Sequence, residues 1–229
     1  MEFLNQPWFI QVGFGLSFAL IVVAFFYIRG QRQRIKQLRE ELDGWMKDAL
    51  TGLASRRRAM EMYHWMFKIV HSARARQGGL HQRKEDGISK SLTLAMFDID
   101  HFKKVNDEHG HLAGDMVLEE FGKILSAQIR ASDIAGRYGG EEFFVVLAAD
   151  VDGMKIFVER VRQELGKKRF QHKGKKFGVT FTCGIATLDD PQCTCEELLE
   201  RADSALLNGK EYRNRVVLWT PERFIHIQF

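Results

Sequence analysis

The chain has 229 residues, of which 45% are apolar, so it can bury the core of one globular domain and still carry a further segment. A formal net charge of +4 suits an anionic partner, but this small excess does not indicate bulk binding of nucleic acid, and none is expected. The three cysteines, Cys183, Cys193 and Cys195, make no disulfide framework and lack the further Cys or His pair of a zinc site.

The first segment is apolar and uncharged from Phe3 to Ile28, which is long enough to cross a bilayer as a helix. Trp8 and Tyr27 lie near its ends, where interfacial aromatic residues are common. No basic residue precedes it, unlike a cleaved signal peptide, and a buried core helix is the alternative. The pattern predicts a transmembrane anchor over residues 1–28.

A basic and then heptad-like segment follows over residues 29–47. Its positive charge, at Arg29, Arg32, Arg34, Lys36 and Arg39, predicts that this side of the membrane is cytoplasmic. Apolar residues recur at steps of three and four, which predicts a short coiled-coil stalk: Ile28, Ile35, Leu38, Leu42, Trp45 and Ala49. A single helix lying on the membrane or on its own domain is the alternative.

The remaining residues, 48–229, show a mixed α/β pattern. In chain order we expect a helix over Arg56–Ala73, a surface loop over Ser72–Ser91, a buried strand over Ser91–Asp100, a helix over Ala113–Arg130, a hairpin over Arg137–Leu147, a helix over Asp152–Leu165, a strand over Phe177–Ile185, a helix over Cys195–Leu207 and a last strand over Arg215–Trp219. This order predicts an α+β fold, in which helices flank a central sheet that contains antiparallel strands.

Acidic residues gather at two of these predicted strand ends. Asp98 and Asp100 are two apart, so they should face the same side, and the Gly-Gly hairpin carries Glu141 and Glu142. Each could be a solvated turn or cap residue, but several carboxylates together are costly unless they bind a cation such as Mg²⁺. Nearby basic residues would complement phosphate: Lys103, Lys104 and Arg137. The residues favour a metal-dependent site for a nucleoside triphosphate.

Four blocks in order, "DALTGLASRRR", "FDIDHFKKVNDEHGHLAGD", "RYGGEEF" and "ERADSAL", resemble the GGDEF family of diguanylate cyclases in its GGEEF form, from about Asp48 to Val217. The resemblance implies a polymerase-palm-like fold. It also implies the condensation of two GTP molecules to cyclic di-GMP with release of two pyrophosphates. Two Mg²⁺ (or Mn²⁺) ions would serve each active site.

The resemblance also implies roles for particular residues. Asp98, Glu141 and the carbonyl of Ile99 would be metal ligands, and Asn106 and Asp115 would bind guanine. Glu142 would be a base or a further metal partner. The remaining expected GTP-binding residues are Phe102, Lys103, Arg137, Gly139, Gly140, Lys210 and Arg213, of which Lys103 also counts as catalytic.

Each such domain binds one GTP, so the resemblance implies a homodimer with two facing domains, which the stalk would bring together. Arg130 and Asp133 form an RxxD motif at the family's offset from the glycines, which implies inhibition by the product; a surface salt bridge at a helix end is the alternative. Arg160 or Arg162 would supply an arginine across the dimer. These expectations place the chain in a bacterial cytoplasmic (inner) membrane, single-pass, with its catalytic domain in the cytoplasm.

Three departures from the family pattern stand out. Ser55 replaces an asparagine, Leu207 replaces a tyrosine, and "KEYRNR" lacks a glycine and is one residue short, which bears on Lys210 and Arg213. The main alternative is a catalytically weak domain that acts as a cyclic di-GMP receptor or membrane scaffold. A cyclase with another base preference and a DNA-binding protein are less favoured.

Overall fold

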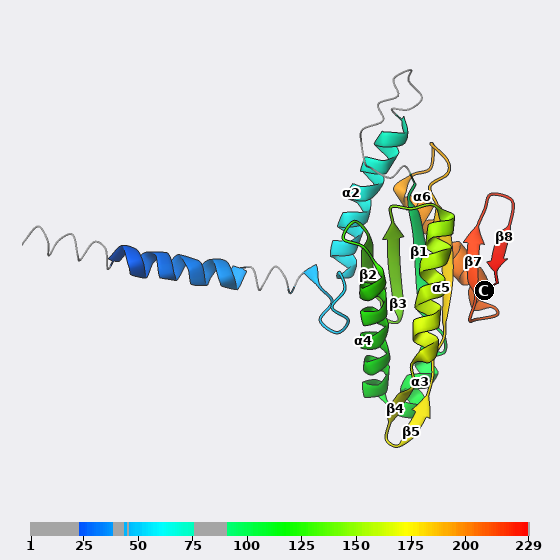
Figure 1. The fold of residues 1–229 in the computed structure, drawn as a ribbon, viewed down its shortest axis with the longest axis horizontal. Helices are drawn as coiled ribbons and strands as arrows, with labels where there is room; N and C mark the ends of the chain where they lie inside the picture. The colour runs from blue at the N-terminus through cyan, green and yellow to red at the C-terminus, as the bar shows by residue number, and fades with distance from the viewer. Residues whose placement is uncertain (1–22, 39–43, 45, 76–90, 229) are drawn as a thin grey trace, which may run out of the picture. The chain divides into compact units, whose positions relative to one another are not determined.

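The computed structural model describes residues 23–38, 44, 46–75 and 91–228. The chain divides into two compact units, Met1–Trp45 and Met46–Phe229. Residues 23–38 of the first unit form a helix, and the second unit is a domain of helices packed on a mixed sheet (Figure 1).

The predicted anchor and stalk fall largely outside the described residues. Residues 1–22 are among those not described, and no helix within the described ranges combines the length and apolarity that a membrane crossing requires. Ile28, Ile35 and Leu38, from the predicted coiled-coil seam, are each about half exposed on the helix of residues 23–38. Ala49 lies in a turn, so the prediction that the helical seam extends to this residue is wrong.

The main sheet has six strands in the order β2-β3-β1-β6-β7-β8. All neighbours are antiparallel except β6 and β7, which are parallel and joined by the crossover helix α6. The bounds are β1 (Thr93–Ile99), β2 (Ile134–Gly139), β3 (Glu142–Leu147), β6 (Phe181–Thr187), β7 (Val216–Trp219) and β8 (Phe224–Ile227).

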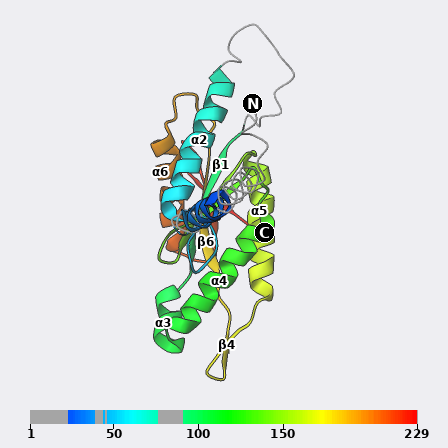
Figure 2. The ribbon, with the colours of Figure 1, turned by 90° about the vertical axis from the view of Figure 1, so that its left-hand side faces the viewer.

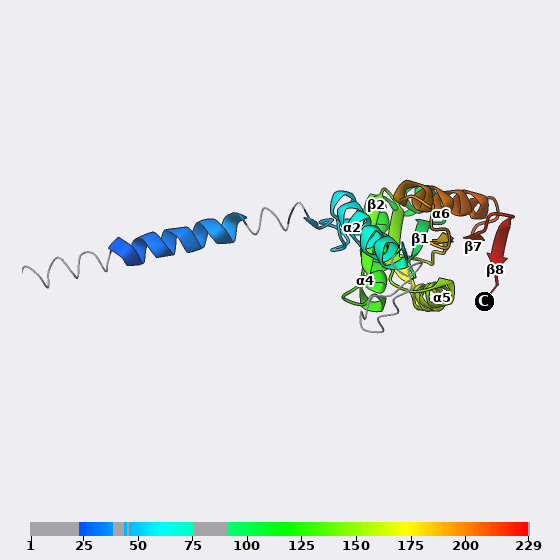
Figure 3. The ribbon, with the colours of Figure 1, turned by 90° about the horizontal axis from the view of Figure 1, so that it is seen from above.

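Helices cover both faces of the sheet (Figure 3). One face carries α2 (Arg56–Ala75) and α6 (Cys195–Lys210), and the other carries α4 (His111–Gln128) and α5 (Val151–Lys167). The short helix α3 (Phe102–His109) follows β1 and leads into α4. Because side chains alternate along a strand, Phe97 of β1 packs with α4 and α5, while Met96 packs with α2 and α6.

Aromatic rings form the centre of the α4–α5 side of the core. Phe97 contacts three other rings edge-on, with centroids 5.3 to 6.4 Å apart. The other members of the cluster are Phe121, Phe143, Phe157 and Phe181. Such edge-to-face pairs add stabilisation beyond the burial of apolar area. This cluster packs directly behind the strand end that carries Asp98, so it fixes the frame of the candidate site.

Local sequence signals set where the helices begin. Asp150 caps α5 by accepting a hydrogen bond from the N–H of Gly153 at 2.9 Å. Thr194 caps α6 in a capping box, in which its hydroxyl accepts from the N–H of Glu197 and the Glu197 carboxylate accepts from the N–H of Thr194.

The structure corrects three predicted boundaries. α2 continues to Ala75, beyond the predicted start of the loop at Ser72. The predicted strand Phe177–Ile185 is two strands: β5 (Lys175–Phe177) pairs with β4 (Phe170–His172) in a hairpin beside α3, and β6 begins at Phe181 (Figure 2). The strand over Arg215–Trp219 is not the last, because β8 follows it.

Candidate functional site

The end of β1 and the turn between β2 and β3 lie side by side. Asp98 pairs with Glu142 in the β1–β3 ladder, and the N–H of Ile99 donates to the carbonyl of Glu141 at 3.4 Å. Gly140 has a φ of +49°, a conformation that favours glycine, so the turn needs a glycine there. The predicted approach of Glu141 and Glu142 to Asp98 is therefore present.

Lys210, at the end of α6, contacts both acidic strand ends. Its Nζ lies 2.7 Å from Oδ2 of Asp98 and 3.6 Å from Oε1 of Glu142. Burial lowers the pKa of Lys210, but the ion pairs with the two carboxylates outweigh this and hold the pKa above its usual value. Lys210 is therefore protonated at neutral pH and stands directly against the carboxylates that were predicted to bind metal.

Asp98 is more enclosed than Glu142: their side chains are 13% and 36% exposed. Burial raises its pKa; Lys210 acts in the opposite direction, and the nearby charges of Glu141 and Glu142 raise the pKa further, so that the net direction is upward. An added cation would relieve this excess of negative charge. Oxygen donors from carboxylate and backbone carbonyl are those that Mg²⁺ prefers, so Asp98, Ile99 and Glu141 fit such an ion.

The predicted cluster of three or four carboxylates is smaller than expected. Within the described residues, no group of three or more His, Cys, Asp or Glu side chains is arranged to hold a metal ion. Asp100 is buried and turned toward β6, where it accepts hydrogen bonds from the hydroxyls of Thr180 and Thr182 and from the N–H of Asn214. Asp100 lies in the turn after β1, and one of its donors, Thr182, is the cross-strand partner of Asp98. That Asp98 and Asp100 face the same side stays a prediction.

The predicted guanine-binding pair lies where α3 meets α4. Asn106 is on α3, Asp115 is exposed on α4, and Gly114, the preceding residue of α4, faces α3. A Cβ at Gly114 would stand 2.0 Å from Oδ1 of Asn106 and 3.0 Å from the Phe102 ring. Because Gly114 has no side chain, Asn106 and Phe102 of α3 can pack directly against the backbone of α4 next to Asp115.

The start of α3 offers groups that suit phosphate. Its N-cap, His101, has a left-handed φ of 55° and forms no side-chain cap to the helix. Lys103 and Lys104 are exposed in the first turn. Exposed cations and uncapped N–H groups at one helix end favour an anion, as the sequence predicted.

Arg137, a predicted ligand of GTP, is bound to other residues near the glycine turn. Its guanidinium pairs with Asp48 at 3.3 Å, and its Nε donates to the carbonyl of Gly140 at 2.9 Å. The backbone N–H of Arg137 also donates to the carbonyl of Ala54 at 3.1 Å. Arg137 therefore joins the turn after Asp48 to the glycine turn.

The predicted product-binding pair lies at the other end of β2. Asp133 accepts a hydrogen bond from the backbone N–H of Arg130 at 2.9 Å, and the Arg130 side chain forms no ion pair within the described part of the chain. Arg130 and Ser132 line a groove of about 1060 Å³ with the α2 residues Met62, Trp65 and Ile69. The alternative of a helix-end salt bridge between Arg130 and Asp133 is wrong.

Other predicted residues lie as follows. Gly139 is exposed, and a Cβ there would meet nothing within 4 Å. Arg213 is exposed in the loop after α6, with a φ of 53°. Arg162 forms a two-bond ion pair with Glu159 on α5. Leu207, which replaces a tyrosine of the family pattern, is 57% exposed.

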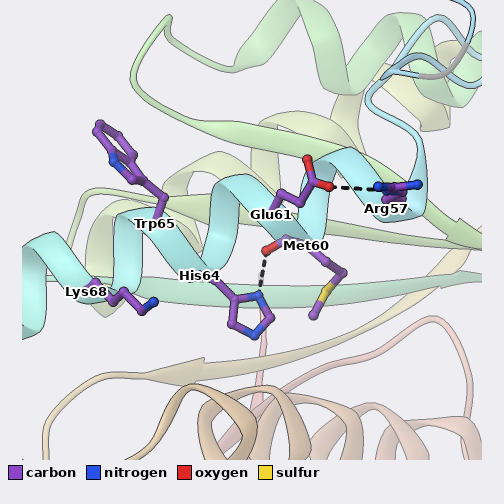
Figure 4. A pocket seen from close by; sticks show the side chains of 6 residues that line it. All are labelled: Arg57, Met60, Glu61, His64, Trp65 and Lys68. Atoms are coloured by element: carbon purple, nitrogen blue, oxygen red, sulfur yellow. Dashed lines mark hydrogen bonds and ion pairs between the residues drawn. The ribbon is translucent and has the colours of Figure 1, made fainter. Parts of the chain in front are cut away.

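A second hollow, of about 580 Å³, lies along the outer surface of α2 and contains none of the predicted site residues (Figure 4). There the His64 ring bonds to the carbonyl of Met60, and Glu61 pairs with Arg57. These groups satisfy one another, so the hollow adds no chemistry to the candidate site.

With this geometry in view, comparison with known proteins identifies the family. Residues 45–215 match the family described as "Diguanylate cyclase, GGDEF domain", and the chain belongs to it. It is 36% identical over 161 residues to Diguanylate cyclase A of Treponema denticola, covering 69% of this chain and 42% of that protein. It is 35% identical over 165 residues to Diguanylate cyclase DgcS of Shewanella oneidensis, covering 72% and 49%. The chain thus spans less than half the length of these two relatives.

Solved structures show the same fold. The coiled coil and GGDEF domain of DgcB from Caulobacter crescentus, in complex with c-di-GMP, superimposes with a TM-score of 0.69 at 26% identity, covering 87% of this chain and 97% of that one. The active GGEEF domain of a diguanylate cyclase from Vibrio cholerae gives a TM-score of 0.62 at 27% identity, covering 73% and 98%. The predicted α+β, palm-like fold is confirmed.

Two groups at the site were missed from the sequence. The role of Asp48 in holding Arg137 had no signal beyond its place in "DALTGL". The partners of Asp100 are Thr180, Thr182 and Asn214, about eighty and over one hundred residues away, and no local pattern points to them.

Proposed function

We propose that this chain is a diguanylate cyclase, which condenses two GTP molecules to cyclic di-GMP and releases two pyrophosphates. One observation carries the proposal: Asp98 and the Glu141–Glu142 pair are adjacent at one end of the sheet, and the uncapped start of α3 follows directly. Carboxylates for a cation and donors for a triphosphate therefore lie on consecutive elements. The family membership of the chain supports the same reaction.

Asp98, Glu141 and the Ile99 carbonyl would hold Mg²⁺ or Mn²⁺, two ions per site, with Glu142 beside them. Such an ion, when bound, polarises the α-phosphate and lowers the pKa of the attacking 3′-hydroxyl. Lys103, Lys210, Arg213 and the N–H groups at the start of α3 would bind the phosphates. Lys210 must leave Asp98 to do so, because the two are paired at 2.7 Å.

Asn106 and Asp115 would select guanine. A carboxylate accepts from the N1–H and the exocyclic amine of guanine together, whereas adenine offers no such pair of donors. The exposed position of Asp115, one residue from the glycine beneath Asn106, supports a base lying over the α3–α4 junction.

The geometry of the product requires two domains. One domain holds one GTP, so a phosphodiester forms only when a second copy presents its own GTP opposite. We propose a homodimer, aligned by a coiled coil over residues 29–47 and tethered by an N-terminal membrane helix in the bacterial inner membrane. The exposed apolar side chains of Ile28, Ile35 and Leu38 support this proposal, because they could pack against the same residues of a second helix.

We also propose feedback by the product at Arg130 and Asp133. The Arg130 guanidinium has no ion-pair partner in the described part of the chain and borders an apolar groove, which suits a ligand with phosphates and flat bases. Arg130→Ala should relieve inhibition by added cyclic di-GMP, measured as the initial rate with GTP and Mg²⁺. Unchanged inhibition would remove this site from the proposal.

The function itself is tested by incubating the full chain with GTP and Mg²⁺ and quantifying cyclic di-GMP. Glu141→Gln should abolish turnover, because the amide keeps the shape of the side chain but removes its charge. Glu222→Gln, at an exposed residue near the C-terminus, is the matched control and should turn over normally. Wild-type rates in Glu141→Gln would refute the metal assignment.

A receptor for cyclic di-GMP is the second candidate. The shortened segment after Lys210 and the exposed Leu207 favour it, since both depart from the family pattern at the expected triphosphate site. If the concentrated wild-type chain forms no product and still binds cyclic di-GMP, the receptor replaces the cyclase.

A further inference from the structure

Asp100 is a buried carboxylate whose function the metal site does not explain. It is 4% exposed, and each of its oxygens is bound. Oδ1 accepts from the Thr182 hydroxyl at 2.6 Å, and Oδ2 accepts from the Thr180 hydroxyl at 2.5 Å and from the backbone N–H of Asn214 at 2.9 Å. No cation pairs with it among the described residues, so three neutral donors replace the water that burial removes.

The third donor belongs to a strained loop. Arg213 and Asn214 both have left-handed φ values, 53° and 46°, in the segment that lacks the glycine expected there. Such a conformation is unfavourable for most side chains, for arginine more than for asparagine, and two in succession persist where other contacts hold them. The bond from Asn214 to Asp100 is such a contact, and Arg215 adds a second by accepting from the N–H of Cys183 at 2.8 Å.

This loop connects α6 with β7, and it begins directly after Lys210. Lys210 precedes the loop and contacts Asp98, while Arg213 lies within it. Asp100 therefore ties the end of the strand that carries Asp98 to the segment that carries the two basic residues.

We propose that Asp100 is a positioning residue of the nucleotide site, which fixes the loop of residues 211–215 so that Lys210 and Arg213 face the triphosphate. It touches neither nucleotide nor metal. This inference rests on the proposed function, because it assumes that GTP is the ligand. It explains how the chain keeps a working geometry without the glycine: a buried carboxylate stabilises the turn instead.

The first test measures binding of a non-hydrolysable GTP analogue, with Mg²⁺, to the full chain. Asp100→Ala should weaken binding by about tenfold, because small misplacements of binding groups are costly. Asp100→Asn keeps an acceptor for the N–H of Asn214 and should bind nearly as well as the wild type. If Asp100→Asn binds as weakly as Asp100→Ala, the charge and not the position matters, and the proposal fails.

A double-mutant cycle with Arg213 shows whether Asp100 acts through the loop. In an Arg213→Ala background, Asp100→Ala should cost less than about tenfold, because one of the two basic groups that it positions is gone. Full additivity of the two losses would overturn the proposal. Thr93→Val is the matched control: Thr93 is buried at the opposite end of β1 and donates to the carbonyl of Ala149, so its loss destabilises the fold without reaching the loop. It should leave affinity unchanged.

A second test needs no nucleotide. Trypsin cleavage after Arg213, followed by mass spectrometry, should be several-fold faster in Asp100→Ala, with cleavage after Lys173 in the β4–β5 turn as internal reference. Equal cleavage ratios in variant and wild type would refute the positioning role. Should Asp100→Ala fail to fold, the paired change Thr180→Val and Thr182→Val removes two of the three donors and should produce the same acceleration.

Nucleotide binding and trypsin cleavage together distinguish failure of the proposed function from failure of the positioning role of Asp100. If the wild type binds no GTP analogue while the loop still opens in Asp100→Ala, the proposed function fails and the structural role of Asp100 stands. If the wild type binds but neither affinity nor cleavage responds to Asp100→Ala, the positioning inference alone is refuted.

Discussion

Lys210 sits where a metal ion and a triphosphate would both act. Its ammonium group contacts Asp98 and Glu142, so it neutralises part of the charge that would attract a cation. In the proposed mechanism, a divalent ion would have to displace this ammonium group before it could bind Asp98, and the displaced side chain would then be free to contact phosphate. Under this proposal, Lys210 would couple metal binding to nucleotide binding.

Removing this competitor should strengthen metal binding and weaken nucleotide binding. Lys210→Met is expected to bind Mn²⁺ alone about threefold more tightly, since a partly exposed ion pair contributes at most about 1 kcal/mol. The KM for GTP should rise in the same variant. Calorimetry without nucleotide measures the first effect, and Lys155→Met, which breaks an ion pair on the surface of α5, is the control. Weaker Mn²⁺ binding in Lys210→Met would contradict the competition.

For single residues, the sequence predicted which residues lie together at the candidate site better than it predicted the partners of their side chains. Asp98 and Glu141 were expected together because their strands could pair, and they do. Arg137 was expected at phosphate because it is basic and precedes the glycines, yet its guanidinium is held by Asp48. Charge alone cannot tell which of several partners a flexible side chain meets when those partners come from distant parts of the chain.

Among the elements, α6 depends on an unusually close approach to β6. A Cβ at Gly184 would lie 2.2 Å from both the carbonyl oxygen of Ala202 and the backbone nitrogen of Leu206. Backbone atoms of a packed helix cannot yield as a side chain can, so the helix itself would have to move. Because α6 ends at Lys210, this packing also sets the position of that residue.

Gly184→Ala should therefore destabilise the domain by about 3 kcal/mol, the upper part of the range for overpacked cores. Gly166→Ala is the matched change: Gly166 lies in α5 with open space where its Cβ would be, so the variant should be neutral or more stable by up to about 1 kcal/mol. Urea unfolding monitored by circular dichroism measures both. Equal stabilities of the two variants would refute the close approach.

The ion pair between Asp48 and Arg137 links the turn after Asp48 to strand β2. Burial raises the pKa of Asp48, but hydrogen bonds from Thr51 and the Arg137 guanidinium outweigh it and hold the pKa below its usual value. A carboxyl with a lowered folded pKa adds stability above its unfolded pKa and loses it as the pH falls through the folded pKa. Asp48 should therefore stabilise the domain at neutral pH and not in acid.

Asp48→Asn should lower the unfolding free energy by about 1 kcal/mol at pH 7, in line with a partly exposed ion pair. The difference from the wild type should shrink as the pH falls below the usual carboxyl range. Unfolding curves across pH give this difference, and Asp203→Asn, at an exposed residue of α6, should show no such trend. A gap that widens in acid would show that the charge of Asp48 is not what stabilises the turn.

The type of an element, helix or strand, could be predicted where the apolar pattern ran over many residues. The exact ends of the elements could not be predicted. The apolar run of β1 and the long predicted helices that became α5 and α6 were each assigned the right type. The β4–β5 hairpin was missed because its turn, at Lys173 and Gly174, interrupts only three residues on each side. Strands this short carry too few alternating residues to separate them from a loop.

At the scale of the whole molecule, the proposed reaction would require two copies of the chain. Each domain would supply one GTP, and each of the two new phosphodiester bonds joins nucleotides held by different domains. An inactive copy should therefore disable its active partner. This property distinguishes a paired site from a domain that works alone, whatever arrangement the two copies take.

Mixing wild type with Glu141→Gln at constant total protein tests this directly. After subunit exchange, activity should follow the square of the wild-type fraction, so an equal mixture keeps about a quarter of the wild-type rate, because only one pairing in four has two intact halves. The measurement is the initial rate of cyclic di-GMP formation across a series of mixing ratios. Glu222→Gln in place of Glu141→Gln should leave the rate constant across the series. A linear decline to about half would mean that each chain acts by itself, since independent catalysts contribute in proportion to their number.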